Sequence, residues 1–163
     1  MSFDFADLLD RFTCAVEAGD GKSLAALFTG DGVYHDTFYG AFKGHDAIVD
    51  MLENRFWGDA EAFLWDMFEP VYDADGHIGY ARWVFSYTSA MDDSVGKRVV
   101  FDGMSLFSVE HGMIRHYREV FSAGLALVQL DMTPDRIDKI LQRMADAHRN
   151  DPEWGRHFAG SPA

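Results

Sequence analysis

The spacing of apolar residues changes once along this chain, from the helical period to a period of two. Before Phe63, apolar residues recur every three or four positions, as they do from Phe5 to Val16, which is the pattern of amphipathic helices. From Phe63 to Ser122 they alternate, and turn sequences such as Asp73–Gly76 interrupt the alternation. Helices followed by an antiparallel meander are typical of the α+β class.

One domain with a helical extension accounts for this pattern. Residues 1–125 are predicted to form the domain, and residues 126–163 a C-terminal helical extension packed on the same domain. Asp20 is positioned to cap the second helix, and Pro134 lies near the first position of the last helix. The predicted elements are helices at 5–16, after Asp20, at 45–57 and after Thr133, and strands at 33–36, 63–72, 79–88, 98–110 and 113–122.

The charge and the cysteine content exclude several classes of protein. The formal net charge of −13 would repel a phosphate backbone and an anionic membrane surface, so we expect neither nucleic acid nor a membrane as a partner. The single cysteine, Cys14, excludes an intramolecular disulfide framework. The sequence has no signal peptide and no long apolar run, which predicts a cytoplasmic location.

Aromatic residues make up 15% of the chain, an excess that predicts a crowded core, a ring-lined cavity or both. The last predicted strands are apolar on both faces, so each face of the sheet needs a cover. The N-terminal helices can cover one face. A second copy of the chain is expected to cover the other, which predicts a homodimer assembled through the sheet.

Two segments carry a resemblance to a known family. EAGDGKSLAALFTGDGVYHD at residues 17–36 and GKRVVFDGMSLFSVEHGMIRHYREV at residues 96–120 resemble the opening and the final hairpin of the nuclear-transport-factor-2-like superfamily, in particular its SnoaL-like branch. In the hairpin, Arg115-His116-Tyr117 stands where SnoaL-like cyclases often carry Glu-His-Trp. The resemblance implies an α+β, cone-shaped roll: a strongly bent antiparallel sheet packs on three N-terminal helices around a pocket, with an extra C-terminal helix.

The relatives implied by this resemblance include ketosteroid isomerases, polyketide cyclases, scytalone dehydratase and epoxide hydrolases, beside members that catalyse nothing known. The resemblance places Asp36 where ketosteroid isomerases have their proton-shuttling aspartate. It places Phe12 and Ser105 where those enzymes have the tyrosine and the protonated aspartic acid that stabilise an oxyanion. Phe12 has no hydroxyl group and Ser105 is a weaker donor, so a true ketosteroid isomerase is disfavoured. The histidine pair of the dehydratase is not reproduced either.

Asp36 has two interpretations. It is either a general base beside an apolar pocket, where burial raises the pKa of a carboxyl group, or a turn cap bonded to the backbone. The last strand also leaves two alternatives open. In the family register Tyr117 and Glu119 face the pocket as further catalytic residues, whereas a slip of one residue would turn His116 and Arg118 inward.

The expected ligand is a small apolar molecule, and no metal or cofactor is predicted, because the His and Asp residues near Asp36 match no ligand spacing. The first hypothesis is a cofactor-independent isomerase, cyclase or dehydratase that acts on a small apolar carbonyl compound by acid–base chemistry. The second is a non-catalytic ligand-binding or dimerisation module. The residues expected to line the pocket are Phe12, Tyr34, Leu52, Phe56, Trp83, Phe85, Ser105, Phe107 and Phe121.

Overall fold

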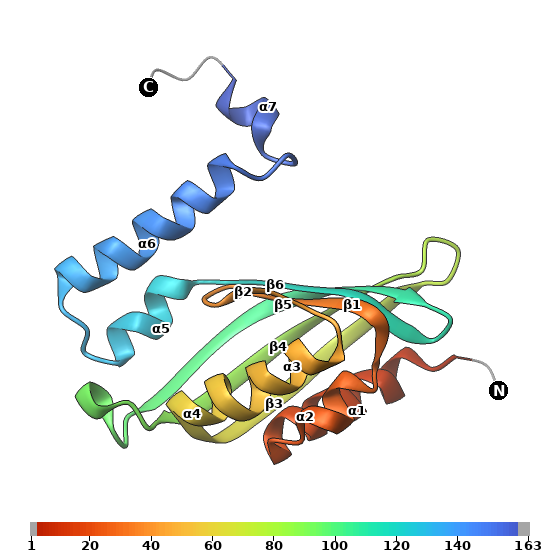
Figure 1. Cartoon of the computed structure of the whole chain (residues 1–163), viewed down its shortest axis with the longest axis horizontal. Helices are drawn as coiled ribbons and strands as arrows, with labels where there is room; N and C mark the ends of the chain where they lie inside the picture. The colour runs from red at the N-terminus through yellow and green to blue at the C-terminus, as the bar shows by residue number, and fades with distance from the viewer. Residues whose placement is uncertain (1–2, 160–163) are drawn as a thin grey trace.

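A curled six-stranded sheet with helices on its inner face forms the body of the protein (Figure 1). The computed structural model describes residues 3–159. The strands follow the order β2-β1-β6-β5-β4-β3 across the sheet, and β1 runs parallel to β6 while the other neighbours are antiparallel. The predicted α+β class is thereby confirmed. The strands are β1 (Phe28–Asp36), β2 (Gly40–Lys43), β3 (Ala60–Asp73), β4 (Ile78–Ser89), β5 (Arg98–Glu110) and β6 (Met113–Phe121).

The first two helices begin and end at residues that the sequence marks. The Asp4 side chain accepts hydrogen bonds from the backbone at the start of α1 (Phe5–Ala18), and Gly19 ends this helix with φ +67°. Asp20 then caps α2 (Gly21–Ala25) through the Ser23 backbone N–H at 2.9 Å. The predicted third helix is present but divided. It consists of α3 (His45–Asp50), the π-helical segment η1 (Met51–Phe56) and α4 (Trp57–Asp59).

Two bulges bend β3, the edge strand, around the inner face. The pairing of β3 with β4 shifts between Glu61 and Leu64 and again between Phe68 and Val71. A residue with positive φ lies in each shift, Ala62 at 51° in the first and Glu69 at 53° in the second. Extra residues of this kind increase the local twist and bend a strand. The sheet therefore curls far enough to leave a cavity between its strands and the helices.

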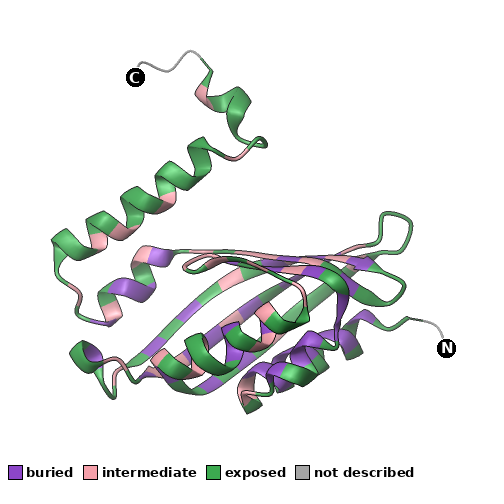
Figure 2. Ribbon diagram, in the orientation of Figure 1, coloured by how far each residue is buried: buried purple, intermediate pink, exposed green. Residues whose placement is uncertain are grey.

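Aromatic residues make up much of the core between the sheet and α1, and Figure 2 shows buried residues in purple on α1 and on the strands. Phe12 of α1 is fully buried, and its ring lies 6.0 Å from Tyr34, 5.5 Å from Phe107 and 5.0 Å from Tyr117, centroid to centroid. Truncating a buried phenylalanine to alanine typically costs about 3–5 kcal/mol. Phe12 is thus a structural link between α1 and three strands.

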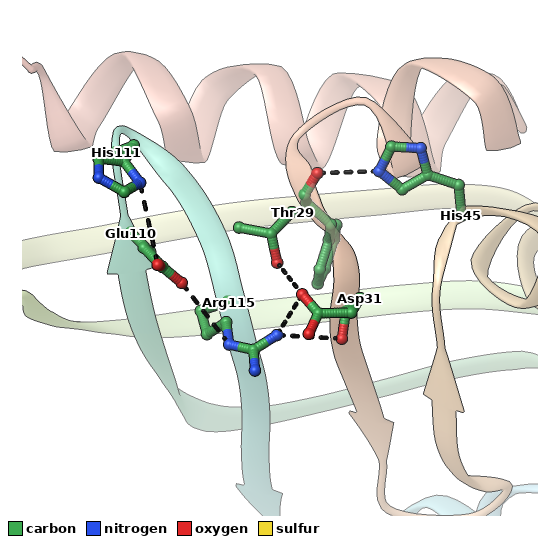
Figure 3. A network of polar contacts seen from close by, with 7 residues as sticks. Thr29, Asp31, His45, Glu110, His111 and Arg115 are labelled. Atoms are coloured by element: carbon green, nitrogen blue, oxygen red, sulfur yellow. Dashed lines mark hydrogen bonds and ion pairs between the residues drawn. The ribbon is translucent and has the colours of Figure 1, made fainter.

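A polar network fixes β1 against β6 at the end of the sheet that is distant from Asp36 (Figure 3). Arg115 of β6 forms ion pairs with Asp31 of β1 and with Glu110 at the end of β5. The Arg115 guanidinium lowers the pKa of the Asp31 carboxyl group. Nearby, His45 contacts the Phe28 carbonyl oxygen through Nε2 at 2.9 Å. These contacts accompany the parallel pairing that brings the end of β1 beside β6.

The C-terminal segment divides into a packed part and a projecting part. Helix α5 (Ala123–Gln129) packs against β5, and the Gln129 side chain bonds both backbone groups of Val100 at 2.9 Å. Helices α6 (Pro134–Arg149) and α7 (Gly155–Phe158) are described along their whole lengths, and none of their residues is buried (Figure 2).

Helix α6 contacts mainly α5 and extends away from the sheet (Figure 1), so the packing of residues 126–163 on the domain stays a prediction. Arg118 of β6 does form an exposed ion pair with Glu153, between α6 and α7. Residues 1–2 and 160–163 of the two predicted units lie outside the described residues. Within residues 3–159, no helix is long and apolar enough to cross a membrane.

Candidate functional site

A ring-lined cavity lies between the inner face of the sheet and the segment from η1 to α4. Its volume is about 100 Å³, and its empty space is about 640 Å³ when the open mouth is included. Eleven of its sixteen lining residues are aromatic, and three are carboxylic acids. The lining consists of Tyr34, Asp36, Phe38, Tyr39, Phe56, Asp59, Ala60, Phe63, Trp65, Trp83, Phe85, Tyr87, Met91, Phe101, Glu119 and Phe121.

Asp36 and Glu119 form a carboxyl pair on one wall of this cavity. Asp36 is the last residue of β1, and Glu119 comes from the neighbouring strand β6. The two carboxyl groups influence each other, because Asp36 raises the pKa of Glu119 whereas Glu119 lowers that of Asp36. Burial raises the pKa of Asp36, and burial together with the charge of Asp36 raises the pKa of Glu119 well above its usual range. The pair therefore holds a proton more tightly than two exposed carboxyl groups would.

The Asp36 side chain also caps the turn that follows its strand. Its Oδ1 accepts hydrogen bonds from the backbone N–H groups of Phe38 and Tyr39, both at 2.7 Å. These bonds favour the ionised form and act against the effect of burial on the pKa of Asp36. Within the pair, Asp36 is therefore the more readily ionised group and Glu119 the more readily protonated one. The two interpretations of Asp36 from the sequence, turn cap and cavity carboxylate, describe the same side chain.

A chain of hydrogen bonds between inward-facing side chains ends on the Glu119 carboxyl group. The Tyr117 hydroxyl group donates to Glu119 Oε2 at 2.7 Å and lies 2.9 Å from Ser105 Oγ. The Trp83 indole N–H donates to the same Ser105 oxygen at 2.8 Å. Since Tyr117 has only one hydroxyl proton and gives it to Glu119, Ser105 donates to Tyr117. The chain thus runs in one direction, from Trp83 through Ser105 and Tyr117 to Glu119, and fixes the position of the Glu119 carboxyl group.

Two buried donors of the cavity have no protein partner. Tyr34 is fully buried and Trp65 nearly so, and both line the cavity. Neither the Tyr34 hydroxyl group nor the Trp65 indole N–H makes a hydrogen bond to the described residues. Burial raises the pKa of Tyr34, and the neighbouring Tyr117 hydroxyl group, which bonds to Ser105 and Glu119, lowers it. Buried donors without a partner cost free energy, and both of these groups belong to residues of the cavity lining.

A third carboxyl group lies at the mouth. Asp59, in α4, is half-buried, and its Oδ2 accepts a hydrogen bond from the Tyr39 hydroxyl group at 2.6 Å. Burial and the charge of Asp59 raise the pKa of Tyr39, and the same two causes raise the pKa of Tyr87 to about 12. The Asp59 carboxylate therefore lies near enough to both tyrosines to disfavour ionisation of their hydroxyl groups.

The predicted site residues occupy three places in the structure. Asp36, Glu119, Tyr34, Phe56, Trp83, Phe85 and Phe121 line the cavity. Tyr117 and Ser105 lie behind the lining, in the hydrogen-bond chain. Phe12, Leu52 and Phe107 are fully buried in the core and are not among the lining residues.

The register of β6 decides between the two alternatives for its inward face. Ser105 lies opposite Glu119, and Phe107 lies opposite Tyr117, so these four residues share the inner face. His116 is half-buried, and Arg118 pairs with Glu153 of the C-terminal segment. The inward-facing pair is therefore Tyr117 and Glu119.

Several lining residues were not named as site residues from the sequence. Phe63 and Trp65 continue the alternation of β3 on the same face as Trp83 and Phe85 of β4, so strand parity could have identified them. Asp59 had no such signal, because it lies in the last turn of the interrupted helix. Within residues 3–159, no three His, Cys, Asp or Glu side chains converge in a way that could hold a metal ion.

Comparison with known proteins identifies relatives of this fold. The model of the SnoaL-like domain matches residues 9–117. An epoxide hydrolase of the LEH-like type from M. tuberculosis shares 19% identity over 76% of this chain and 86% of its own, with a TM-score of 0.62.

A protein with a ketosteroid isomerase-like fold from Catenulispora acidiphila, solved in complex with trimethylamine, shares 17% identity over 78% of this chain and 98% of its own, with a TM-score of 0.68. The epoxide hydrolase/cyclase-like enzyme SalBIII of salinomycin pyran ring formation shares 15% identity over 72% of this chain and 90% of its own, with a TM-score of 0.62. At these identities the likeness shows the fold. Among curated proteins, none matches the chain.

Proposed function

Because the chain belongs to the SnoaL-like domain family, we propose that its cavity binds a small apolar carbonyl compound and isomerises, cyclises or dehydrates it by cofactor-independent proton transfer. The observation that carries this proposal is the carboxyl pair of Asp36 and Glu119, which faces the same ring-lined cavity as two donors without partners. A carboxylate for the proton and donors for the oxygen are the groups that enolisation requires.

In the proposed mechanism Asp36 is the general base. Its carboxylate removes a proton from the carbon next to the carbonyl group, and the electron pair of that C–H bond moves onto the carbonyl oxygen as an enolate. The Tyr34 hydroxyl group and the Trp65 indole N–H stabilise this oxygen. One such donor contributes on the order of 10²–10³ in rate. Return of the proton to another carbon completes an isomerisation, and loss of a β-hydroxyl group would complete a dehydration.

Glu119 and the hydrogen-bond chain that ends on it control whether Asp36 is ionised. Glu119 is the more readily protonated group of the pair, and Tyr117 donates to Glu119 Oε2. This arrangement keeps one proton on the pair and leaves Asp36 ionised. A base whose pKa is raised toward the working pH is more effective than an ordinary carboxylate. Tyr117 is thus a positioning residue, and Glu119 shares the proton of the base.

The test is exchange of the α-hydrogens of 1-tetralone in D₂O, followed by proton NMR. We expect the wild type to accelerate exchange and Asp36→Asn to lose at least about a hundredfold of that acceleration, with ketone binding changed only a few-fold. Asp75→Asn, in the exposed turn between β3 and β4, is the matched control for the change in charge. Equal exchange by the wild type and Asp36→Asn, with the ketone bound to both, would contradict the assignment of Asp36.

The second candidate function is binding without catalysis. It is favoured by the two backbone hydrogen bonds that occupy Asp36 Oδ1 and by Phe12, which has no hydroxyl group at the position of the family's oxyanion tyrosine. This alternative predicts that Asp36→Asn has no effect on ligand binding. Met91→Trp would instead abolish ligand binding, because Met91 lines the cavity and a larger side chain there would block it.

We also propose that the chain forms a homodimer through the outer face of the sheet. Large apolar side chains are exposed on several strands, among them Leu64 and Phe68 of β3, Val100 and Met104 of β5, and Val120 of β6, which pairs with Met104. Exposed apolar side chains that gather on one face are typical of interfaces. Sedimentation equilibrium should give a dimer mass for the wild type and a monomer for Met104→Asp. A wild-type monomer at all concentrations would exclude the dimer.

A further inference from the structure

The ionisable groups that line the cavity all have the same sign. Asp36, Glu119 and Asp59 are the titratable acids of the lining besides the tyrosines, and the lining contains no lysine, arginine or histidine. Asp36 and Glu119 place acidic groups on the inner wall, and Asp59 places a third at the mouth. A carboxylate or phosphate on the ligand would be repelled at both places.

The charge at the mouth lies among aromatic rings. Asp59 bonds to Tyr39, whose ring centroid is 5.8 Å from that of Phe56. The Phe56 ring is 6.4 Å from Phe63, and Phe63 is 6.0 Å from Tyr87. All five residues line the cavity. Four rings beside one carboxylate form the surrounding that attracts an ammonium group, because ring faces are negative and the carboxylate supplies the counter-charge.

The inner end of the cavity requires the opposite kind of group. The unpartnered hydroxyl group of Tyr34 and indole N–H of Trp65 are donors, and they match an oxygen acceptor. Phe56 connects the two ends, because its ring lies 6.2 Å from Tyr34 and 5.8 Å from Tyr39. A ligand that reaches both ends would therefore pass beside the Phe56 ring.

We infer that the cavity is selective for amino ketones and related cationic molecules, with the carbonyl oxygen at Tyr34 and Trp65 and the ammonium group at Asp59. This inference rests on the proposed function for the carbonyl end, whereas the ammonium end stands on the charges and rings of the mouth. It assigns a specificity role to Asp59, which takes no part in the proton transfer.

The test compares three probes of one shape and different charge. They are 4-acetyl-N,N,N-trimethylanilinium, its neutral isostere 4-tert-butylacetophenone, and the anionic 4-acetylbenzoate, titrated into the full chain and followed by protein NMR. We expect the wild type to bind the cation at least tenfold more tightly than the neutral isostere, and the anion most weakly. A quaternary nitrogen is used because its charge does not change with pH.

Two variants assign the selectivity to the mouth. Asp59→Asn should reduce the preference for the cation to less than threefold, and Tyr87→Leu should weaken it by removing one ring face without a change in charge. Asp75→Asn, in the exposed turn between β3 and β4 and outside the cavity, should keep the wild-type preference. Equal affinity of the wild type for cation and neutral isostere would overturn the inference, as would an unchanged preference in Asp59→Asn.

The outcome is separable from that of the proposed function. Loss of the cation preference in Asp59→Asn, together with unchanged tetralone exchange in Asp36→Asn, would leave an amine-binding site without catalysis. Exchange that depends on Asp36, together with equal binding of cation and neutral isostere, would leave a catalyst without this selectivity and would overturn the inference made here.

Discussion

Two neighbouring tyrosines offer an internal comparison of what a buried hydroxyl group contributes. Tyr34 and Tyr117 are both fully buried, and their ring centroids are 4.5 Å apart. The Tyr117 hydroxyl group bonds to Glu119 and Ser105, whereas the Tyr34 hydroxyl group has no protein partner. Substitution by phenylalanine removes the same atom from nearly the same environment, so the difference between the two variants measures the hydrogen bonds of Tyr117.

The magnitudes follow from the two sets of contacts. Tyr117→Phe removes one bond to a carboxyl group and one to a hydroxyl group, which together amount to about 2–4 kcal/mol of unfolding free energy. For a chain of this length that is a fall in Tm of roughly 4–16 °C. Tyr34→Phe removes a donor whose burial without a partner is itself unfavourable by about 1–3 kcal/mol. We therefore expect Tyr34→Phe to be as stable as the wild type or more stable.

The assay is urea unfolding at pH 7, monitored by tryptophan fluorescence and by far-ultraviolet circular dichroism, with the m-value as a check that the same surface is exposed on unfolding. The expected order of midpoints is Tyr34→Phe at or above the wild type, and Tyr117→Phe well below it. If Tyr34→Phe were destabilised as much as Tyr117→Phe, the Tyr34 hydroxyl group would have a partner in solution. The Tyr34 hydroxyl group would then not be free for a ligand.

Two further predictions concern the carboxyl pair and the C-terminal helices. Since the folded-state pKa of Glu119 is raised, the stability that it contributes is complete below about pH 4 and is lost as the pH rises through the folded-state pKa. Glu119→Gln should therefore gain stability relative to the wild type between pH 5 and pH 8 in urea titrations, and a constant difference would refute this account. Deletion of residues 134–163 should lower Tm by less than about 3 °C in calorimetry, because α6 and α7 bury no residue and exposed ion pairs contribute about 0–1 kcal/mol each. A larger loss would show that these helices stabilise the domain.

Local sequence signals determined much of the fold. Asp4, Asp20 and Gly19 define the ends of the first helices, and the period of two identifies the four long strands to within a few residues. Because side chains alternate along a strand, the register that turns Glu119 inward also turns Tyr117 inward. These features depend on neighbours in the chain, so the sequence is sufficient to predict them.

Other features depend on contacts between distant segments. The short strand β2, the π-helical segment η1 and helix α5 were not predicted, and the bulges of β3 place non-glycine residues at positive φ. Such conformations are unfavourable locally and persist only because the surrounding sheet imposes them. Without these bulges the parity of β3 and the curvature of the sheet would differ, so the size of the cavity is a tertiary property.

The sequence by itself determined that this chain would place an aspartate at the end of a strand among aromatic rings, in an α+β domain with a large negative charge. Only the tertiary structure decided what that aspartate faces. The parallel pairing of β1 with β6 brings Asp36 to Glu119, and the curled sheet brings Asp59 to the mouth of the same cavity. The physical reason is that a carboxyl pKa and a cavity charge depend on distances in space, and distances between remote residues follow from strand pairing rather than from local sequence.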